Sequence, residues 1–386
     1  MHIVDVCAFY TPHGGGVKTY VEQKLAMAAK FGHKITILAP ADHHSVRHIG
    51  ENAQIVTIPG PRFPLDRKYW YFGDEAALHQ ALDELAPDFV EVSSPWRSAS
   101  MVARWTGAAP RALVMHADPL SAYAYRWLEP LLSREAIDRR FASFWSHLRD
   151  MGGRFDRVVC ASGELRDRLA AGGVANTALH PMGIEAGIFS PQRRNPELRR
   201  QMLALCDLPE DAHLLIGVGR LAPEKRWPMV VDAVMAASQS LPIGLILLGQ
   251  GGQKKRIMRQ IAGNPHIRIL KPERDRLQFA SLLASADALI HGCEAETFCM
   301  AAAEARASGV PVIVPDTGGA ADHGRGGAGL HYRAGSALAA ADATLRLLAH
   351  PPVVESKHVV TMEQHFAALF DDYAALVAGG NDLRVA

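Results

Sequence analysis

The sequence predicts an α/β protein with two doubly wound, Rossmann-like domains. Short apolar segments alternate with segments of helical periodicity, and this alternation restarts near the middle of the chain. The chain has 386 residues, which is enough for two domains of roughly 100–200 residues each. In such folds, ligands bind beyond the carboxyl ends of the strands.

The first half of the chain contains apolar segments that we expect to be strands. They are residues 2–10, 34–40, 54–59, 89–93, 112–116 and 157–161. Most of these segments do not alternate with polar residues, which is typical of parallel strands buried on both faces. Helical periodicity predicts helices at residues 17–31, 74–85 and 163–171.

The second half repeats this organisation after a polar stretch at residues 185–209. Strands are expected at residues 213–218, 242–248, 267–270, 288–291 and 310–314, and helices at 227–238, 252–261, 276–284 and 300–307. We expect an N-terminal domain over 1–183, a hinge near 183–200 and a C-terminal domain over 184–362. A last segment, 363–386, is expected to be helical at 363–377.

Composition excludes several classes of protein. The net charge is +1, with 48% apolar and 21% charged residues, so no overall field favours nucleic acid and no nucleic-acid partner is expected. The N-terminus lacks a basic start, and no run of about 18 apolar residues occurs, so neither a signal peptide nor a membrane span is predicted.

The five cysteines are scattered and form no CxxC pair. A reducing, cytoplasmic compartment is therefore expected. Cys293, Cys299 and the nearby His291 resemble part of a metal site, but this partial set does not close a tetrahedral zinc site.

A glycine-rich loop follows the first expected strand. Gly14, Gly15 and Gly16 precede a helix, where backbone amides can bind phosphate, although a tight strand-to-helix turn explains the glycines equally well. The loop lacks the third glycine of a dinucleotide fingerprint and the Gly-Lys-Ser/Thr of a P-loop. Asp42 follows the second strand, so an NAD-type dehydrogenase is disfavoured but stays open.

Two cations follow the first strand of the second domain. Arg220 and Lys225, in the loop that begins at Gly219, can converge on one diphosphate, where the guanidinium binds two oxygens and the ammonium acts as a point charge. A solvated basic loop is the alternative.

Two carboxylates follow a later strand of the same domain. Glu296 lies before a helix that Thr297 is expected to cap, and Glu304 lies within the first two turns of that helix. The two can bind successive parts of an extended ligand such as a sugar and a ribose. Surface positions for both are the alternative.

Three further positions follow expected strands. His116 can contact a substrate hydroxyl or developing charge, although a structural histidine is the alternative. Gly249 and Gly251 form a turn that can approach phosphate or sugar closely.

Taken together, these motifs resemble the retaining GT-B glycosyltransferases of family 4 over essentially the whole chain. The shared features are the Gly-Gly-Val turn, the Gly-Arg-Leu-x-x-Glu-Lys loop, the Gly-x-Gly turn and the two glutamates followed by Ala-x-Ala-x-Gly-x-Pro-Val. One departure is Cys299, where the family often has glycine. Another is 182–185, Met-Gly-Ile-Glu, where Asn-Gly-Val-Asp is common.

The resemblance implies two Rossmann-like domains facing across a cleft, with the donor on the C-terminal domain and the acceptor mostly on the N-terminal one. It implies that Arg220 and Lys225 hold the donor diphosphate, Glu296 the sugar and Glu304 the ribose. His116 would lie near the donor sugar. Further implied donor contacts are Gly15, Gly16, Gly219, Gly249, Gly251, Lys271, Thr297, Phe298, Cys299 and Met300. The last helix would cross back to the N-terminal domain.

The expected reaction is front-face transfer of a hexose or hexuronic acid from a UDP-sugar, or from a GDP-sugar such as GDP-mannose. The sequence has no Asp-x-Asp triplet, so cations and helix N-termini would replace a metal, and no metal or other cofactor is expected. The nucleobase would contact backbone around residues 270–272.

The acceptor half carries basic and aromatic stretches at residues 62–72 and 126–149. They suit sugar stacking, helix packing or docking on anionic lipid headgroups. A lipid, lipid-linked or saccharide acceptor is expected, with peripheral association at the inner face of the membrane. Two alternatives stay open beside the dehydrogenase: an epimerase or phosphorylase-like enzyme on the same fold, and a non-catalytic sugar-nucleotide sensor.

Overall fold

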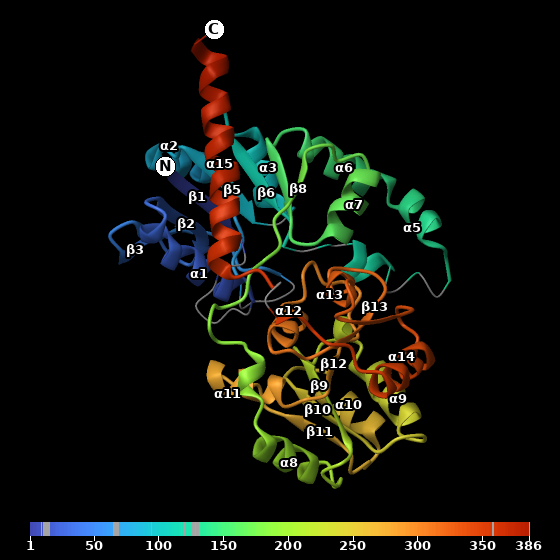
Figure 1. Cartoon of the computed structure of the whole chain (residues 1–386). Helices are drawn as coiled ribbons and strands as arrows, with labels where there is room; N and C mark the ends of the chain where they lie inside the picture. The colour runs from blue at the N-terminus through green and yellow to red at the C-terminus, as the bar shows by residue number, and fades with distance from the viewer. Residues whose placement is uncertain are drawn as a thin grey trace. The chain divides into compact units, whose positions relative to one another are not determined.

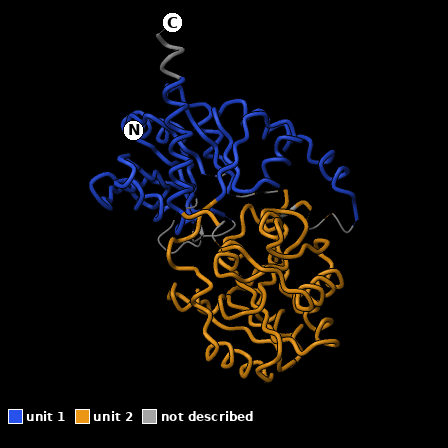
Figure 2. The backbone as a smooth tube through the Cα atoms, viewed as in Figure 1, with its two compact units in different colours: residues 1–117, 131–181, 362–386 blue, residues 118–130, 182–361 orange. Residues whose placement is uncertain are grey.

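The computed structural model describes residues 1–8, 10, 16–64, 69–93, 95–116, 118, 120–125, 128, 131–356 and 359–385. The chain divides into two compact units, coloured separately in Figure 2. Unit 1 contains Met1–Ala117, Leu131–Pro181 and Met362–Ala386, and unit 2 contains Asp118–Pro130 and Met182–Thr361.

Unit 1 is built on an 8-stranded sheet with the order β3-β4-β2-β1-β5-β6-β7-β8. Its strands are β1 (His2–Cys7), β2 (Lys34–Ala41), β3 (Ser45–Gly50), β4 (Ala53–Pro59), β5 (Phe89–Ser93), β6 (Arg111–Val114), β7 (Arg157–Cys160) and β8 (Thr177–Leu179). Strand β3 pairs antiparallel with β4, and the other pairs are parallel. Strands β1, β2 and β5 are buried along almost their whole length, which is typical of strands that have helices on both faces of the sheet.

Helices flank this sheet in Figure 1. They are α1 (Gly16–Lys30), α2 (Glu75–Leu85), α3 (Arg97–Arg104), α5 (Arg134–Arg140), α6 (Ala142–Gly152), α7 (Gly163–Ala171) and α15 (Met362–Val385). The side chain of Asp74 caps α2, and that of Ser162 caps α7.

The final helix, α15, packs on unit 1. Phe366, Leu369, Phe370 and Tyr373 are buried at the i, i+3, i+4 and i+7 spacing of one helix face. The ring of Tyr373 stacks on Phe89 of β5 with a centroid separation of 4.0 Å. Apolar burial therefore holds this helix against the sheet.

A buried ionic cluster also ties α15 to the sheet. Lys24 of α1 donates to Asp5 of β1 over 2.8 Å and to Glu91 of β5 over 2.5 Å, and all three side chains are fully buried. The hydroxyl of Tyr373 donates to the other oxygen of Glu91 over 2.9 Å. Burial raises the pKa of Glu91 to about 7, although Lys24 opposes this shift.

Unit 2 is built on a 6-stranded parallel sheet with the order β11-β10-β9-β12-β13-β14. Its strands are β9 (His213–Val218), β10 (Ile243–Leu248), β11 (Ile267–Leu270), β12 (Ala288–Ile290), β13 (Val312–Pro315) and β14 (Gly329–Tyr332). The strand order reverses between β9 and β12. This topological switch point is where doubly wound sheets bind ligands.

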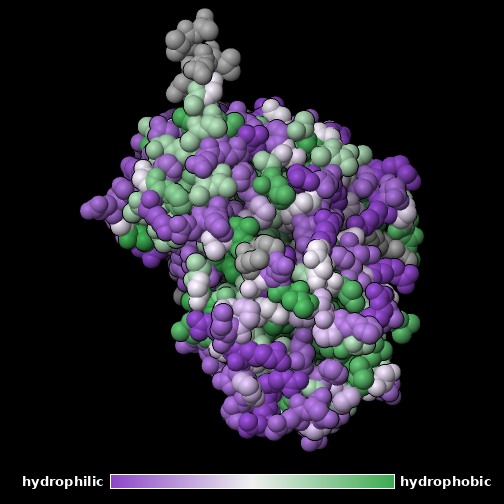
Figure 3. Space-filling model, in the orientation of Figure 1, coloured by the Kyte–Doolittle hydropathy of each residue, from purple (hydrophilic) through white to green (hydrophobic). Residues whose placement is uncertain are grey.

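The helices of unit 2 include short turns as well as longer segments. They are η1 (Leu120–Tyr125), η2 (Pro191–Arg193), α8 (Pro196–Leu205), η3 (Pro223–Lys225), α9 (Trp227–Ala237), α10 (Lys254–Ile261), α11 (Arg276–Ala284), α12 (Met300–Ala307), α13 (Ala321–Gly324) and α14 (Ala337–Ala349). Trp227 is fully buried in the core between this sheet and its helices. Hydrophilic side chains cover much of the outer surface around α8 in Figure 3, as expected for a helix that buries Met202 and Leu203.

The α/β class with two parallel sheets is confirmed, and several details of the prediction are wrong. The first strand ends at Cys7 rather than at residue 10, and β3 adds an antiparallel edge. The polar stretch 185–209 contains η2 and α8, whose starts are capped by Ser190 and Asn195. Strand β14 and helix α14 were not expected, because a four-residue strand and an alanine-rich helix give weak periodicity.

Candidate functional site

The candidate site of unit 2 is formed by the loops that follow β9 and β12. Strand β9 is followed by Gly219, Arg220 and the short helix η3, which ends at Lys225. Strand β12 is followed by His291 and by the loop that carries Glu296. Because β9 and β12 are neighbours at the switch point, residues far apart in the sequence meet there.

Lys225 and Glu296 form an ion pair in which the Lys225 ammonium donates to Oε1 of Glu296. Their side chains are 14% and 20% exposed. Burial alone would lower the pKa of Lys225, but the Glu296 carboxylate holds it above its usual value. Burial would likewise raise the pKa of Glu296, but Lys225 and His291 hold it well below its usual range. Both partners are therefore charged at neutral pH.

Arg220 is an exposed cation of the site. Its side chain is 75% exposed and its guanidinium donates to Glu224 over 2.8 Å. The backbone is fixed, because the indole N–H of the buried Trp227 donates to the Arg220 carbonyl over 2.8 Å. A positioned backbone with a solvated guanidinium suits capture of an anionic ligand.

Glycines allow the loops of this sheet edge to pack closely. Gly251 has a φ of +156°, and a Cβ there would lie 2.5 Å from the Leu221 carbonyl oxygen. Gly319 donates its N–H to the Glu296 carbonyl over 2.6 Å, and a Cβ there would collide with the Thr297 backbone. The contacts of Gly251 and Gly319 require glycine because a side chain would separate the loops.

Two further predicted residues follow strands of this sheet. Gly249 follows β10, and the exposed Lys271 follows β11.

The loop before α12 differs from the prediction that Thr297 caps this helix. The N-cap residue is Cys299, with φ 76° and ψ 73°, and its side chain makes no capping hydrogen bond. Cys299 thus occupies a left-handed conformation that favours glycine. Phe298 is buried edge-on against His323, whose Nε2 bonds to the Phe298 carbonyl over 2.8 Å. Met300 is the first residue of α12.

Glu304 lies on the inner face of α12 and is 6% exposed. Arg276 of α11 donates to it over 2.6 Å and donates to Glu185 over 2.5 Å. The guanidinium also lies over the rings of Phe189 and Phe279. Burial raises the pKa of Glu304 to about 7, although Arg276 opposes the shift. Glu304 is therefore not the exposed helix residue of the alternative interpretation.

Three charged residues of this region escaped the sequence analysis. Arg226 binds both oxygens of Glu294 with its Nε, at 2.8 Å and 2.7 Å, and Glu294 is 2% exposed. Arg276, the partner of Glu304, was also missed. Arg226 directly follows Lys225 and Glu294 precedes Glu296 by two residues, so proximity to the predicted residues was the available signal.

The remaining predicted residues belong to unit 1. The half-buried His116 follows β6, and its ring lies edge-on to Tyr20 with a centroid distance of 4.9 Å. Burial lowers the pKa of His116 to about 4, so the imidazole is neutral at pH 7. Gly16 is the first residue of α1, and Gly15 lies outside the described residues.

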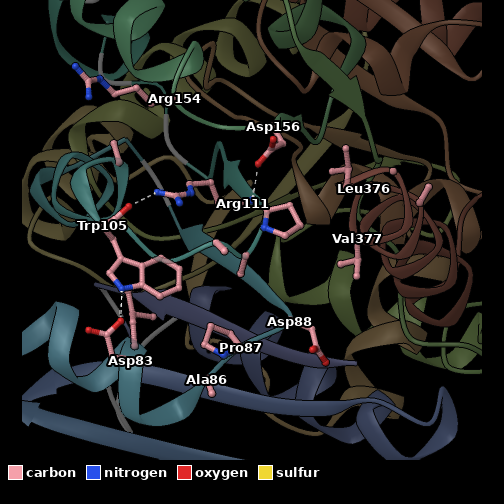
Figure 4. A pocket seen from close by; sticks show the side chains of 17 residues that line it. Asp83, Ala86, Pro87, Asp88, Trp105, Arg111, Arg154, Asp156, Leu376 and Val377 are labelled. Carbon is pink, nitrogen blue, oxygen red and sulfur yellow. Dashed lines mark hydrogen bonds between the residues drawn. The ribbon is translucent and has the colours of Figure 1, made fainter. Parts of the chain in front are cut away.

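A different cavity of unit 1, of about 1100 Å³, is lined by segments that precede β5, β6 and β7 and by α15. Figure 4 shows Trp105 bonded to Asp83, and Arg111 bonded to Asp156 through its backbone N–H. This cavity lies at the amino ends of the strands. Among the described residues that line it, none belongs to the predicted site.

Solved structures define the class of fold. Sucrose-phosphate synthase from Thermosynechococcus elongatus superposes with a TM-score of 0.75 at 19% identity, covering 98% of this chain and 99% of that chain. Anabaena Alr3699/HepE in complex with UDP and glucose superposes with a TM-score of 0.63 at 17% identity, covering 100% and 98%. With two Rossmann-like units and a site at a switch point, the chain has the GT-B fold of glycosyltransferases.

Sequence comparisons then define the family. Residues 14–188 match Glycosyltransferase Family 4, and residues 212–350 match Glycosyl transferases group 1. The Mycobacterium tuberculosis protein named GDP-mannose-dependent alpha-(1-6)-phosphatidylinositol dimannoside mannosyltransferase is 30% identical over 321 residues, covering 82% of this chain and 80% of that protein. GDP-mannose-dependent alpha-mannosyltransferase of Mycolicibacterium smegmatis is 27% identical over 329 residues, covering 83% and 81%. The chain belongs to glycosyltransferase family 4 and is a glycosyltransferase that acts on nucleotide sugars.

Among the residues that the structure describes, no helix is long and apolar enough to cross a membrane.

Proposed function

We propose that this chain is a retaining hexosyltransferase whose donor binds at the switch point of unit 2. The observation that carries the proposal is the Lys225–Glu296 pair beside the exposed Arg220. Arg220 and Lys225 bind the diphosphate, Glu296 binds the sugar and Glu304 binds the ribose. The backbone at Gly219, Gly249, Gly251 and Lys271 and the segment 297–300 complete the donor site. Gly15 and Gly16 of the glycine-rich loop are retained as proposed donor contacts on the sequence motif alone.

We favour GDP-mannose as the donor. The sequence analysis favoured a UDP-sugar, but relatives that share most of the chain are named GDP-mannose-dependent. Alr3699/HepE, whose structure holds UDP, is only 17% identical and supports the fold alone. Thermal-shift measurements with GDP-mannose, UDP-glucose, ADP-glucose and NAD test this choice. Stabilisation by GDP-mannose supports it, whereas stabilisation by a UDP-sugar or by NAD alone overturns it.

We assign the chemical step to this chain's own cations. The bond between the anomeric carbon and the phosphate oxygen breaks while the acceptor oxygen bonds to the same face of the sugar. The acceptor's proton passes to the leaving phosphate. Arg220 and Lys225 neutralise the charge that develops on that phosphate, which is the type of stabilisation that most accelerates such reactions. The neutral imidazole of His116 orients a sugar hydroxyl.

The anomeric configuration of the product, measured by NMR, tests retention. An inverted product would overturn the front-face mechanism. Activity that survives exhaustive chelation tests the proposal that no metal is required. Turnover of donor without glycosidic product would instead favour the epimerase, and donor binding without turnover would favour a sensor.

We propose a glycolipid acceptor. An apolar pocket of about 200 Å³ in unit 1 is lined by aromatic side chains that include Phe63, Tyr71, Phe72 and Trp96. Trp96 follows β5, so the pocket lies at the carboxyl end of the sheet, where acceptors of this fold are expected. Such a lining binds hydrocarbon through burial of apolar surface. A relative is named for phosphatidylinositol dimannoside, which agrees with a lipid acceptor.

A comparison of lipid and deacylated acceptors tests this pocket. Trp96→Ala should raise KM at least about tenfold for the lipid and leave KM for the deacylated sugar unchanged. Trp70→Ala removes a nearby indole that does not line the pocket and serves as the control. Equal effects of the two variants would contradict the assignment.

We further propose peripheral binding to an anionic membrane, which would place the enzyme at the inner face of the membrane. Arg139 and Arg140 are exposed in the last turn of α5, and Leu131 before this helix is 81% exposed. Cations beside an exposed apolar side chain favour anionic lipid surfaces. The wild type should float with phosphatidylserine vesicles, and the double variant Arg139→Glu, Arg140→Glu should not. Arg200→Glu on α8 is the control. If this variant lost vesicle binding to the same extent, net charge alone would explain the binding.

A further inference from the structure

Three side chains of metal-ligating type converge beside β12. His291 follows the strand, Glu296 lies in the next loop, and Cys299 is the N-cap of α12. Their candidate ligand atoms all lie within 4.8 Å of one another. Nε2 of His291 lies 3.0 Å from Oε1 of Glu296. These are one nitrogen, one oxygen and one sulfur donor at a single point.

The burial of His291 gives a second, independent observation. The residue is 1% exposed, and within the described ranges its Nδ1 has no hydrogen-bond partner, whereas Nε2 lies beside Oε1 of Glu296. Its ring lies edge-on to Trp227 at a centroid distance of 6.2 Å, which satisfies neither nitrogen. A buried polar group without a hydrogen bond is costly, and bonding to a metal would remove part of that cost.

We propose that His291, Glu296 and Cys299 form a Zn²⁺ site that competes with the sugar donor. Zinc bonds to nitrogen, oxygen and thiolate sulfur at about 2.0–2.3 Å, and open sites with three protein ligands are common. A tetrahedral arrangement with these bond lengths separates its ligand atoms by about 3.3–3.7 Å. The Cys299 sulfur therefore needs to approach the other two ligand atoms by at most about 1.5 Å, and the 3.0 Å between Nε2 of His291 and Oε1 of Glu296 needs to widen slightly.

The ligand chemistry selects zinc over magnesium. Thiolate and imidazole are poor ligands for Mg²⁺, which prefers oxygen and keeps several waters. The Cys299 thiol loses its proton to solvent on binding, and the thiolate and the Glu296 carboxylate then neutralise the two positive charges of the ion. The fourth position is open to water.

Zinc and the donor should compete because both would bind through Glu296. Both Lys225 and His291 approach Oε1 of Glu296, so a zinc ion on this carboxylate displaces the Lys225 ammonium. This part of the inference rests on the proposed function, in which Lys225 binds the diphosphate and Glu296 binds the sugar. Zinc therefore acts as an inhibitor, which is compatible with a reaction that needs no metal.

Cobalt substitution tests the site independently of activity. Metal-free protein is titrated with Co²⁺, and thiolate-to-cobalt charge transfer in the near ultraviolet is recorded, followed by displacement with Zn²⁺. The wild type should bind one ion. Cys299→Ala should lose the absorption band and at least about 100-fold in affinity, because one ligand of three is gone. His291→Gln should weaken binding while keeping the thiolate band, and it replaces Cys299→Ala if that variant fails to fold.

Cys293→Ala is the matched control, since Cys293 is a buried thiol of the same loop outside the three ligands. It should retain the band. An absent band in the wild type, or equal loss in Cys293→Ala and Cys299→Ala, would overturn the site.

The apparent Kd of GDP-mannose should rise in proportion to Zn²⁺ above the zinc Kd. Zinc binding with unchanged donor affinity would overturn the competition. Failure of metal-free protein to bind any nucleotide sugar would instead overturn the proposed donor site, while the cobalt spectrum would still report on the zinc site.

Discussion

The ammonium of Lys225 bonds to the carboxylate of Glu296 across the switch point of unit 2. The two residues are 71 positions apart in the sequence and are brought together by the neighbouring strands β9 and β12. Before any donor binds, each residue thus already has an ionic partner. An incoming diphosphate must therefore share or replace the bond between them.

The effects of removing Lys225 and Glu296 on stability should be coupled. Lys225→Ala leaves the Glu296 carboxylate largely buried without its cation, which costs about 3 kcal/mol in the free energy of unfolding. The double variant Lys225→Ala, Glu296→Ala should lose at least about 1 kcal/mol less than the sum of the single variants. Urea unfolding of the four proteins measures this coupling. Strict additivity would mean that the pair contributes nothing.

Removal of Arg220 should affect donor binding but not stability. Its guanidinium is 75% exposed, so Arg220→Ala should change the free energy of unfolding by less than about 0.5 kcal/mol. The lost charge-assisted hydrogen bonds should weaken donor binding by about 10- to 100-fold. Isothermal titration with donor gives the Kd. Arg200→Ala, which also removes an exposed arginine with a helical ion pair, is expected to bind normally.

At position 299, a glycine variant should be more stable than an alanine variant. Its φ of 76° costs a residue with a Cβ about 1 kcal/mol, so Cys299→Gly should be more stable than Cys299→Ala by about that amount. Both variants lose the thiol, so the comparison isolates the backbone. At Cys293, which is not among the positive-φ residues, alanine should instead be the more stable by about 0.5 kcal/mol. Thermal or urea unfolding decides, and the same order at both positions would refute the backbone explanation.

Glu304 should make stability depend on pH. Its pKa is about 7 in the folded protein and 4.5 in the reference state, so the folded state binds more protons between these values. Protonated Glu304 therefore stabilises the folded state. This stabilisation is complete below about pH 4.5 and is lost as the pH rises to about 7, and it amounts to on the order of 3 kcal/mol at most in the free energy of unfolding. Glu304→Gln should flatten this part of the pH profile. Glu91 contributes in the same direction in both proteins, so an unchanged slope in the variant would exclude Glu304.

Tyr373 should stabilise unit 1 through its hydroxyl. Tyr373→Phe keeps the stack on Phe89 but leaves one oxygen of the buried Glu91 without this donor, at a cost of about 1–3 kcal/mol. The loss should appear in unfolding curves and as faster hydrogen exchange in α15. Tyr71→Phe, in a loop of the same unit, is the control. Equal stability of Tyr373→Phe and wild type would assign the anchoring of α15 to apolar packing alone.

The sequence by itself determined the α/β class and the glycosyltransferase family. The alternation of apolar and helical segments along the chain indicates strands that are buried on both faces of a sheet. The motifs that contain Gly219, Arg220, Lys225, Glu296 and Glu304 can be read directly from the sequence. Loop residues that directly follow strands could therefore be singled out, although their roles remain proposals.

Only the tertiary structure decided the partners of these residues. The pairing of Glu304 with Arg276, of Arg226 with Glu294 and of His291 with Glu296 joins different loops and helices. The tertiary structure also made Cys299, rather than Thr297, the N-cap residue of α12, in a left-handed conformation. The reason is physical: charge pairing and backbone strain depend on distances set by sheet order and helix packing, which no local pattern in the sequence encodes.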